Sequence, residues 1–227
     1  MIKLSALFAT ILFAAAGSAN AGILLASGAP SYTLSTNSNT AVTLPLGSKQ
    51  SGGLLVDFTF SVSKELQNND FMAVYFGNSD GPNIGLKANC GGDTAGCTND
   101  IFLRMKGTNG KDSRYVAGTD IKIGTDYHLF GYLYKTGDST NYNAFDLWVN
   151  PTDAEMVSLN GADLHITGDT GIASFASAGI RTANLEDNKQ VVTVTGLAVS
   201  EVPEPATLSL FGLAAAGMGF LRRRKQA

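Results

Sequence analysis

The sequence has few of the residues on which catalytic and metal centres most often depend. Its 227 residues include two histidines and two cysteines, and Asp, Glu, Lys and Arg together make up only 15%. The motifs H-E-x-x-H and C-x-x-C do not occur, which removes common signatures of zinc proteases and dithiol oxidoreductases. We therefore predict that the protein is not an enzyme.

The carboxylates are also arranged unlike those of a glycoside hydrolase, which needs two of them facing one cleft. The glutamates of the body stand singly, at Glu65, Glu155, Glu186 and Glu201, and the pattern E-x-D-x-x-E is absent. Asp153 and Glu155 are expected in a solvated turn. His128 and His165 are expected to be half-exposed strand residues. A secreted glycan-active hydrolase on a jelly-roll fold remains the alternative, which a carboxylate pair in one groove would favour.

Basic residues are scarce in the body of the chain. Residues 22–202 hold eleven basic and eighteen acidic residues, a net charge of −7, because five of the sixteen basic residues lie near the two ends. This balance excludes the basic footprint of a nucleic-acid-binding domain and a polybasic patch for anionic lipid. It also predicts that the body as a whole does not favour polyanions unless a cation takes part.

The N-terminus has the three parts of a secretory signal peptide. Lys3 supplies a positive charge, residues 4–16 form an apolar run, and Ala19 and Ala21 supply the small residues of a cleavage site. We predict that residues 1–21 are removed by signal peptidase and that Gly22 becomes the first residue. The alternative is an uncleaved membrane helix, for which the run is short of the ~20 residues that a span needs.

The last 26 residues, 202–227, also divide into three parts. Residues 203–205 read Pro-Glu-Pro, where fixed φ angles and missing donors hold the chain extended. The apolar residues 206–221 would span about 24 Å as a helix, slightly short of a hydrocarbon core of ~30 Å. The tail 222–227 begins with four basic residues, which by the positive-inside bias stay in the cytoplasm. Residues 22–201 would then lie outside the inner membrane.

This tail resembles the PEP-CTERM sorting signal of Gram-negative bacteria. The resemblance rests on Pro203, Glu204 and Pro205, on the helix 206–221, and on the basic cluster Arg222, Arg223, Arg224 and Lys225. It implies recognition by an exosortase, a membrane protease that removes the tail, in organisms that make exopolysaccharide. The inner-membrane anchor would then be transient, and the protein would reach the cell surface or the medium. The alternative is a permanent tail-anchored helix.

The body, residues 22–201, shows the period-two pattern of β-strands. Residues 54–62 alternate apolar and polar side chains, as an antiparallel strand with one buried face requires. Turn-forming residues separate further candidates. These candidates cover residues 32–35, 71–76, 84–87, 101–105, 127–135, 145–150, 178–181 and 191–199. The predicted fold class is all-β, an antiparallel two-sheet sandwich of the jelly-roll type.

One predicted hairpin indicates which type of jelly roll the body forms. Residues 127–134 and 145–151 form a long strand, a polar turn and an aromatic strand that ends in Asn-Pro. This pattern resembles the central hairpin of laminin G-like, concanavalin A-type jelly rolls. The resemblance implies binding of glycans or proteins, in some relatives through calcium; a sandwich with no ligand is the alternative. Trp148 and the tyrosines are expected to be packing residues more than a platform for sugars.

Cys90 and Cys97 enclose a glycine-rich segment, which an exported setting would close as a disulfide. A metal site is the alternative, but it needs more ligands, and neither histidine is near in sequence. We predict no cofactor. Two oxygen-rich segments are weak candidates for calcium, although neither has the carboxylate spacing of a known calcium loop. They contain Asn78, Asp80 and Asn83, and Asp93, Asn99 and Asp100.

Together these features predict a non-catalytic, exported protein of the cell surface or extracellular matrix. Its expected processing partners are signal peptidase and an exosortase. Its body is expected to associate with exopolysaccharide, as in a biofilm, or with another surface protein, and not with nucleic acid.

Overall fold

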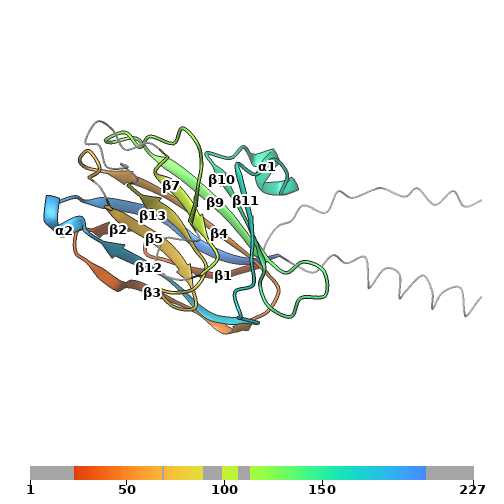
Figure 1. Ribbon diagram of the computed structural model, residues 1–227. Coiled ribbons are helices and arrows are strands. Elements are labelled where there is room, and N and C mark those ends of the chain that lie inside the picture. The colour runs from red at the N-terminus through yellow and green to blue at the C-terminus, as the bar shows by residue number, and fades with distance from the viewer. Residues whose placement is uncertain (1–22, 68, 89–98, 107–112, 203–227) are drawn as a thin grey trace, which may run out of the picture.

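Two antiparallel sheets are stacked as two layers in the computed structural model, which describes residues 23–67, 69–88, 99–106 and 113–202 (Figure 1). Sheet A runs in the order β1 (Ile23–Ser27), β13 (Val192–Val202), β4 (Gly53–Val62), β9 (Tyr127–Tyr134), β10 (Ala144–Val149) and β11 (Leu164–Thr167), with β2 (Ser31–Leu34) also paired to β13. Sheet B runs in the order β3 (Ser38–Gln50), β12 (Phe175–Ala183), β5 (Phe71–Phe76), β6 (Asn83–Lys87), β7 (Ile101–Arg104) and β8 (Ser113–Tyr115). The predicted all-β sandwich is confirmed.

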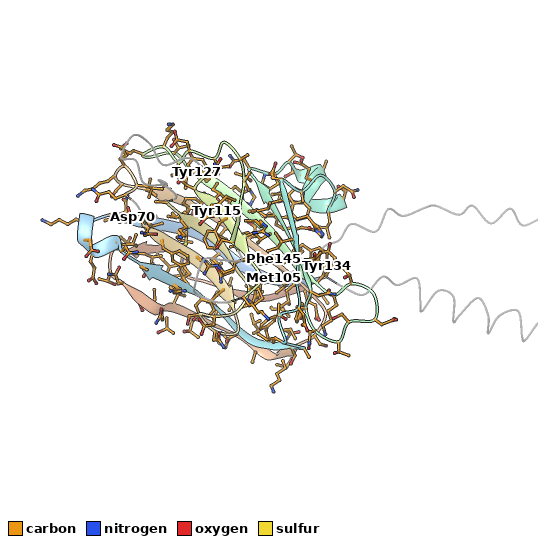
Figure 2. All side chains as sticks on the ribbon, viewed as in Figure 1. Asp70, Met105, Tyr115, Tyr127, Tyr134 and Phe145 are labelled. Atoms are coloured by element: carbon orange, nitrogen blue, oxygen red, sulfur yellow. The ribbon has the colours of Figure 1, made fainter. Side chains whose placement is uncertain are left out.

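Alternation along the strands builds the core between the sheets. In β4, Leu54, Val56, Phe58 and Phe60 point inward and are buried, while Asp57 and its alternate neighbours point outward. Figure 2 shows the packed interior, in which Phe145 of β10 is fully buried. Burying large aromatic and branched side chains on both inner faces is the main term that stabilises such a sandwich.

Nine expected strands are present, most of them with ends shifted by a residue or two. The structure adds β1, β3 and β8, and it places His165 in the short strand β11. These additions alternate poorly: β3 is mostly exposed along its length and pairs only with β12 within sheet B. The hairpin that suggested the jelly roll is formed by β9 and β10, which pair from Ala144 opposite Tyr134 to Val149 opposite Leu129.

The expectation of a simple turn around Asp153 is wrong, because α1 (Asp153–Ser158) is a short helix there. Thr152 is its N-cap, and the Glu155 carboxylate returns to the Thr152 backbone N–H at 2.8 Å, which forms a capping box. The expectation of solvent exposure holds, since α1 has no buried residue. A second short helix, α2 (Leu185–Asn188), connects β12 to β13.

The connection that carries α1 covers part of the outer face of sheet A, and α1 lies to the right of β9 and β10 in Figure 1. Trp148 is 1% exposed there, packs against Phe130 at 5.6 Å between ring centroids, and donates its Nε1 hydrogen to the Asn160 carbonyl at 2.9 Å. Leu55 completes this small second core. Trp148 is therefore a packing residue, as expected.

Several predicted features lie outside the described residues. These are the signal peptide with its cleavage site between Ala21 and Gly22, the sorting motif with the apolar and basic tail, and the cysteine pair Cys90 and Cys97. Their predictions stay as predictions. Within the described ranges, no helix is long and apolar enough to cross a bilayer.

Candidate functional site

A cluster of cations and aromatic rings lies on the outer face of sheet B. We call it the cationic face and define it by Phe71, Lys87, Phe102, Arg104 and Arg181. In β5, the inward positions are Met72, Val74 and Phe76, so strand alternation turns the intervening positions outward, and the same parity applies to the paired strands. The sheet therefore gathers residues that are more than 100 positions apart in the sequence.

Arg104 forms the buried centre of the cationic face. It is 2% exposed, and its Nε donates to the Ser113 hydroxyl at 2.9 Å. Its guanidinium carbon lies 5.2 Å from the centroid of the Phe102 ring and 5.9 Å from that of Phe71. Contact with two ring faces offsets part of the cost of removing a guanidinium from water.

Arg181 and Lys87 flank the Phe71 ring from the two strands beside β5. The guanidinium carbon of Arg181 lies 5.0 Å from the ring centroid, and its Nε and Nη1 atoms are buried with no hydrogen-bond partner in the described part of the chain. Lys87 is directly opposite Phe71 in the register of β5 and β6. Burial lowers the pKa of Lys87, and the charge of Arg104 lowers it further. The cationic face thus concentrates positive charge around one ring.

The outer face of sheet A carries a different cluster, which we call the tyrosine–histidine face: Tyr132, Tyr134, Asp146 and His165. The two tyrosine rings stack with centroids 4.5 Å apart, and Asp146 accepts a hydrogen bond from His165 Nδ1 at 2.5 Å. The His165 side chain is 53% exposed, against 12% for Asp146. Burial, followed by the Asp146 charge and hydrogen bond, raises the pKa of Tyr134 to about 12.

The second histidine makes a similar pair farther along sheet A. His128 Nε2 lies 2.7 Å from the Asp57 carboxylate, and this hydrogen bond raises the pKa of His128. Both histidines are thus outward-facing strand residues, as expected. Asp57 and Asp146 lie on β4 and β10 with β9 between them, which separates their backbones by about 10 Å or more. Each carboxylate has its own histidine, so the two do not form a hydrolase-like pair.

One serine motif in the sequence was overlooked. Residues 77–81 read Gly-Asn-Ser-Asp-Gly and match G-x-S-x-G. A nucleophile elbow needs a strand followed by a helix, whereas this segment is the turn between the antiparallel strands β5 and β6. Asn78 Oδ1 accepts from the Asp80 backbone N–H at 2.9 Å, which is the geometry of a local turn. The motif gives no elbow here.

Two of the weak calcium candidates, Asn99 and Asp100, accept backbone hydrogen bonds, whereas Asn83 Oδ1 is buried with no hydrogen-bond partner among the described residues. Asn99 Oδ1 accepts from the Gly118 N–H at 2.6 Å, and Asp100 Oδ2 accepts from the Ile121 N–H at 3.3 Å. Asn83 is buried, and its amide donates to the Gly81 carbonyl at 2.7 Å. In the described part of the chain, no group of three or more His, Cys, Asp or Glu side chains gathers around a common point; Asp93 lies outside it.

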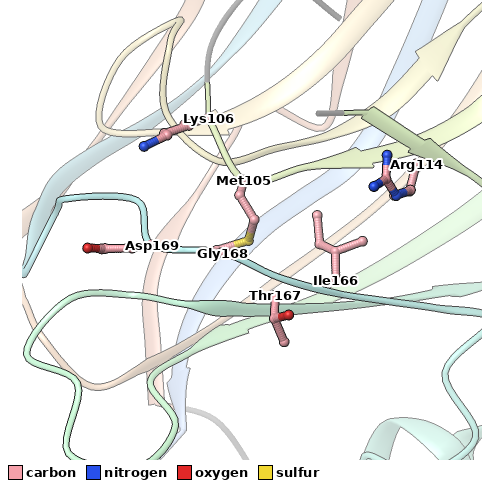
Figure 3. Close-up of a pocket in the computed structure, with 7 residues that line it drawn as sticks. All are labelled: Met105, Lys106, Arg114, Ile166, Thr167, Gly168 and Asp169. Carbon is pink, nitrogen blue, oxygen red and sulfur yellow. The ribbon is translucent and has the colours of Figure 1, made fainter. Parts of the chain in front are cut away.

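A pocket of about 310 Å³ opens where the edges of the two sheets meet, between β7 and β8 on one side and β11 on the other (Figure 3). Met105 and Ile166 lie in its middle, and Lys106, Arg114 and Asp169 lie around them. Hydrogen bonds from the Gly171 backbone and Asn141 lower the pKa of Asp169, and Lys106 adds to this shift. Its lining carries both positive and negative side chains, so the pocket favours neither an anionic nor a cationic ligand.

Comparison with solved structures shows similarity to several β-sandwich proteins, all distant. Alginate lyase Aly36B is 12% identical, with 76% of this chain and 80% of that chain covered and a TM-score of 0.46. A functionally unknown protein from Saccharomyces cerevisiae is 14% identical, with 77% of this chain and 89% of that chain covered and a TM-score of 0.43. The binding domain of Paraclostridial Mosquitocidal Protein 1 is 12% identical, with 81% of this chain and 50% of that chain covered and a TM-score of 0.47. No curated protein matches the chain.

The C-terminal sequence gives a clearer match. Residues 201–225 fit the protein-family model described as the PEP-CTERM protein-sorting motif. The chain therefore combines a jelly-roll β-sandwich with a PEP-CTERM sorting motif, as the sequence predicted. This motif implies exosortase processing and an exported protein that has a C-terminal membrane anchor before processing.

Proposed function

We propose that this protein is an exosortase-processed component of the cell surface or extracellular matrix, and that its sandwich domain binds glycan or protein there without catalysis. The sorting motif at residues 201–225 is the observation that carries the proposal. The outer faces of the sandwich support it, because His165 on sheet A is exposed, and Lys87 and Arg181 on sheet B are partly exposed. Association with exopolysaccharide, as in a biofilm, is inferred because such tails occur in organisms that make exopolysaccharide.

A test of the sorting half replaces Pro203, Glu204 and Pro205 together by Ala in the native host. The apolar run and the basic cluster stay intact, so insertion should persist while processing stops. We expect the protein to accumulate in the inner membrane with its tail attached, detected with an epitope placed after Ala227. Efficient cleavage and release of this variant would overturn the sorting role.

The matched variant replaces residues 222–225 by neutral residues and leaves the Pro-Glu-Pro motif intact. Loss of the stop-transfer signal should let uncleaved protein escape into the periplasm. The two variants therefore differ in the compartment where the uncleaved chain collects. If both collect in the same compartment, the motif and the basic cluster do not have separate roles.

Glycan-active catalysis is the second candidate, and the tyrosine–histidine face favours it. Exposed His165 is oriented by Asp146, and a hydrogen-bonded tyrosine lies beside the same carboxylate. Such a group could move a proton during bond cleavage. Incubation with polysaccharides of different linkages and assay of new reducing ends tests this function. Activity that His165→Ala abolishes would replace the binding proposal with an enzymatic one.

A further inference from the structure

Positive charge converges on the Phe71 ring from three strands. Arg181 comes from β12, Lys87 from β6 and Arg104 from β7, and two of the guanidinium groups lie 5.0 and 5.9 Å from the ring centroid. Like charges brought together in a partly buried place repel one another, which is why Arg104 contributes to the lowered pKa of Lys87. A sheet face of this kind is stabilised by an added anion.

The described residues provide no such anion for Arg181. Its Nε and Nη1 atoms have no hydrogen-bond partner, and its one recorded interaction is with the Phe71 ring. On the other sheet, by contrast, Asp57 and Asp146 are each paired with a histidine. Arg181 Nε and Nη1 are themselves buried, but Arg181 and Lys87 are only partly buried as whole residues, so a ligand can reach the exposed part of each side chain.

We propose that the cationic face binds the carboxylates of an acidic polysaccharide, with Arg181 and Lys87 as the contacts on either side of Phe71. The proposal rests on the proposed function, because export brings this face to extracellular polymers. It names the ligand class that the body would take.

The spacing of the two cations favours a polymer. Arg181 and Lys87 lie on strands separated by β5, so their backbones are about 10 Å apart or more. A single carboxylate does not bridge that distance with ease, whereas an extended uronate chain carries a carboxylate on every ring.

Contact is essential for this recognition because the body carries a net charge of −7. At physiological salt, fields are screened beyond ~8 Å, so overall repulsion acts weakly once the polymer is docked. The sequence expectation that the body disfavours polyanions describes its average charge, whereas one sheet face locally has the opposite sign.

Binding is measured with the full chain, purified in an uncharged detergent from a host without exosortase, so that the result does not depend on sorting. Polygalacturonate is the probe, and its methyl ester, dextran and poly-L-glutamate are compared with it on a biosensor surface. We expect polygalacturonate to bind most tightly and its methyl ester to lose about tenfold or more, because charge-assisted contacts are lost.

Variants test the assigned contacts. Arg181→Ala should weaken polygalacturonate binding about tenfold or more, and Lys87→Ala about threefold to tenfold. Lys49→Ala is the matched control, because Lys49 is an exposed cation on β3 of the same sheet. It should leave binding unchanged. Arg181→Lys keeps the charge and should fall between the parent and Arg181→Ala, and thermal melting checks that each variant is folded.

Three results would overturn the proposal. They are equal binding of the methyl ester, unchanged binding by both Arg181→Ala and Lys87→Ala, and tighter binding of poly-L-glutamate than of polygalacturonate. The last would assign the face to an acidic protein partner. None of these outcomes bears on the processing of the tail, so a failure here is distinct from a failure of the sorting experiments.

Discussion

The charged residues on the outer faces of the two sheets have different kinds of partner. On sheet A the outward carboxylates Asp57 and Asp146 each have a histidine within 2.7 Å. On sheet B the guanidinium groups of Arg104 and Arg181 lie against aromatic rings, and Arg181 Nε and Nη1 have no hydrogen-bond partner among the described residues. Because a locally neutralised face gains little from a charged ligand, we expect sheet B and not sheet A to take one.

The largest effect on stability is expected at Trp148, which the connection carrying α1 covers on sheet A. Trp148→Ala removes a buried indole and its hydrogen bond to Asn160, and should lower the free energy of unfolding by about 3–5 kcal/mol. Urea denaturation measures the loss, and Trp148→Phe, which retains a buried aromatic ring, should lose less. A change below about 1 kcal/mol would mean that the connection carrying α1 does not pack on sheet A.

A smaller effect is expected at the centre of the cationic face. Arg104→Ala should cost about 2–4 kcal/mol, because it leaves a cavity beside Phe71 and Phe102. Arg104→Met keeps much of the volume and removes the charge, so its stability should stay within about 1.5 kcal/mol of the parent. It should also raise the pKa of Lys87, measured by NMR titration, because one of the two causes of the lowered value is gone. An unchanged Lys87 pKa would contradict their proximity.

The smallest effect concerns the paired acids of sheet A. The Asp57 hydrogen bond raises the pKa of His128, so its contribution to stability is present below the unfolded-state pKa of ~6.5 and is lost as pH rises through the folded-state value. Asp57→Asn should lower the His128 pKa and remove this pH dependence, a change of about 0.5 kcal/mol at a partly exposed pair. NMR titration of His128 together with unfolding at pH 5 and 8 measures it; identical curves for parent and variant would contradict the pairing.

Period-two alternation predicts the strands that bury one face well. Residues 54–62 illustrate this, because their inward side chains are all apolar and large. The strand β3 was missed because it lies at an edge of sheet B and is mostly exposed, so that only Leu44 and Leu46 mark its buried face. The helix α1 was missed although Thr152 and Glu155 form a capping box, because the adjacent Asn-Pro pair suggested a turn.

The cationic face could not be predicted from the sequence. Lys87, Arg104 and Arg181 are isolated cations along the chain, and a net charge of −7 gives no sign of them. Their convergence depends on the strand order of sheet B and on the register that sets Lys87 opposite Phe71. Register is a property of long-range pairing, which a local pattern does not contain. The sorting motif is the opposite case, because all of its parts are contiguous and were readable in the sequence.

The place of β13 in sheet A has a mechanical consequence. The strand ends at Val202, directly before the sorting motif, and it is held by β4 on one side and by β1 and β2 on the other. A pull on the C-terminal segment along the strand axis would load these backbone hydrogen bonds in parallel, and a strand sheared this way yields only when many bonds break together. The domain would therefore withstand tension through its own tether better than a domain whose last strand peels from an edge.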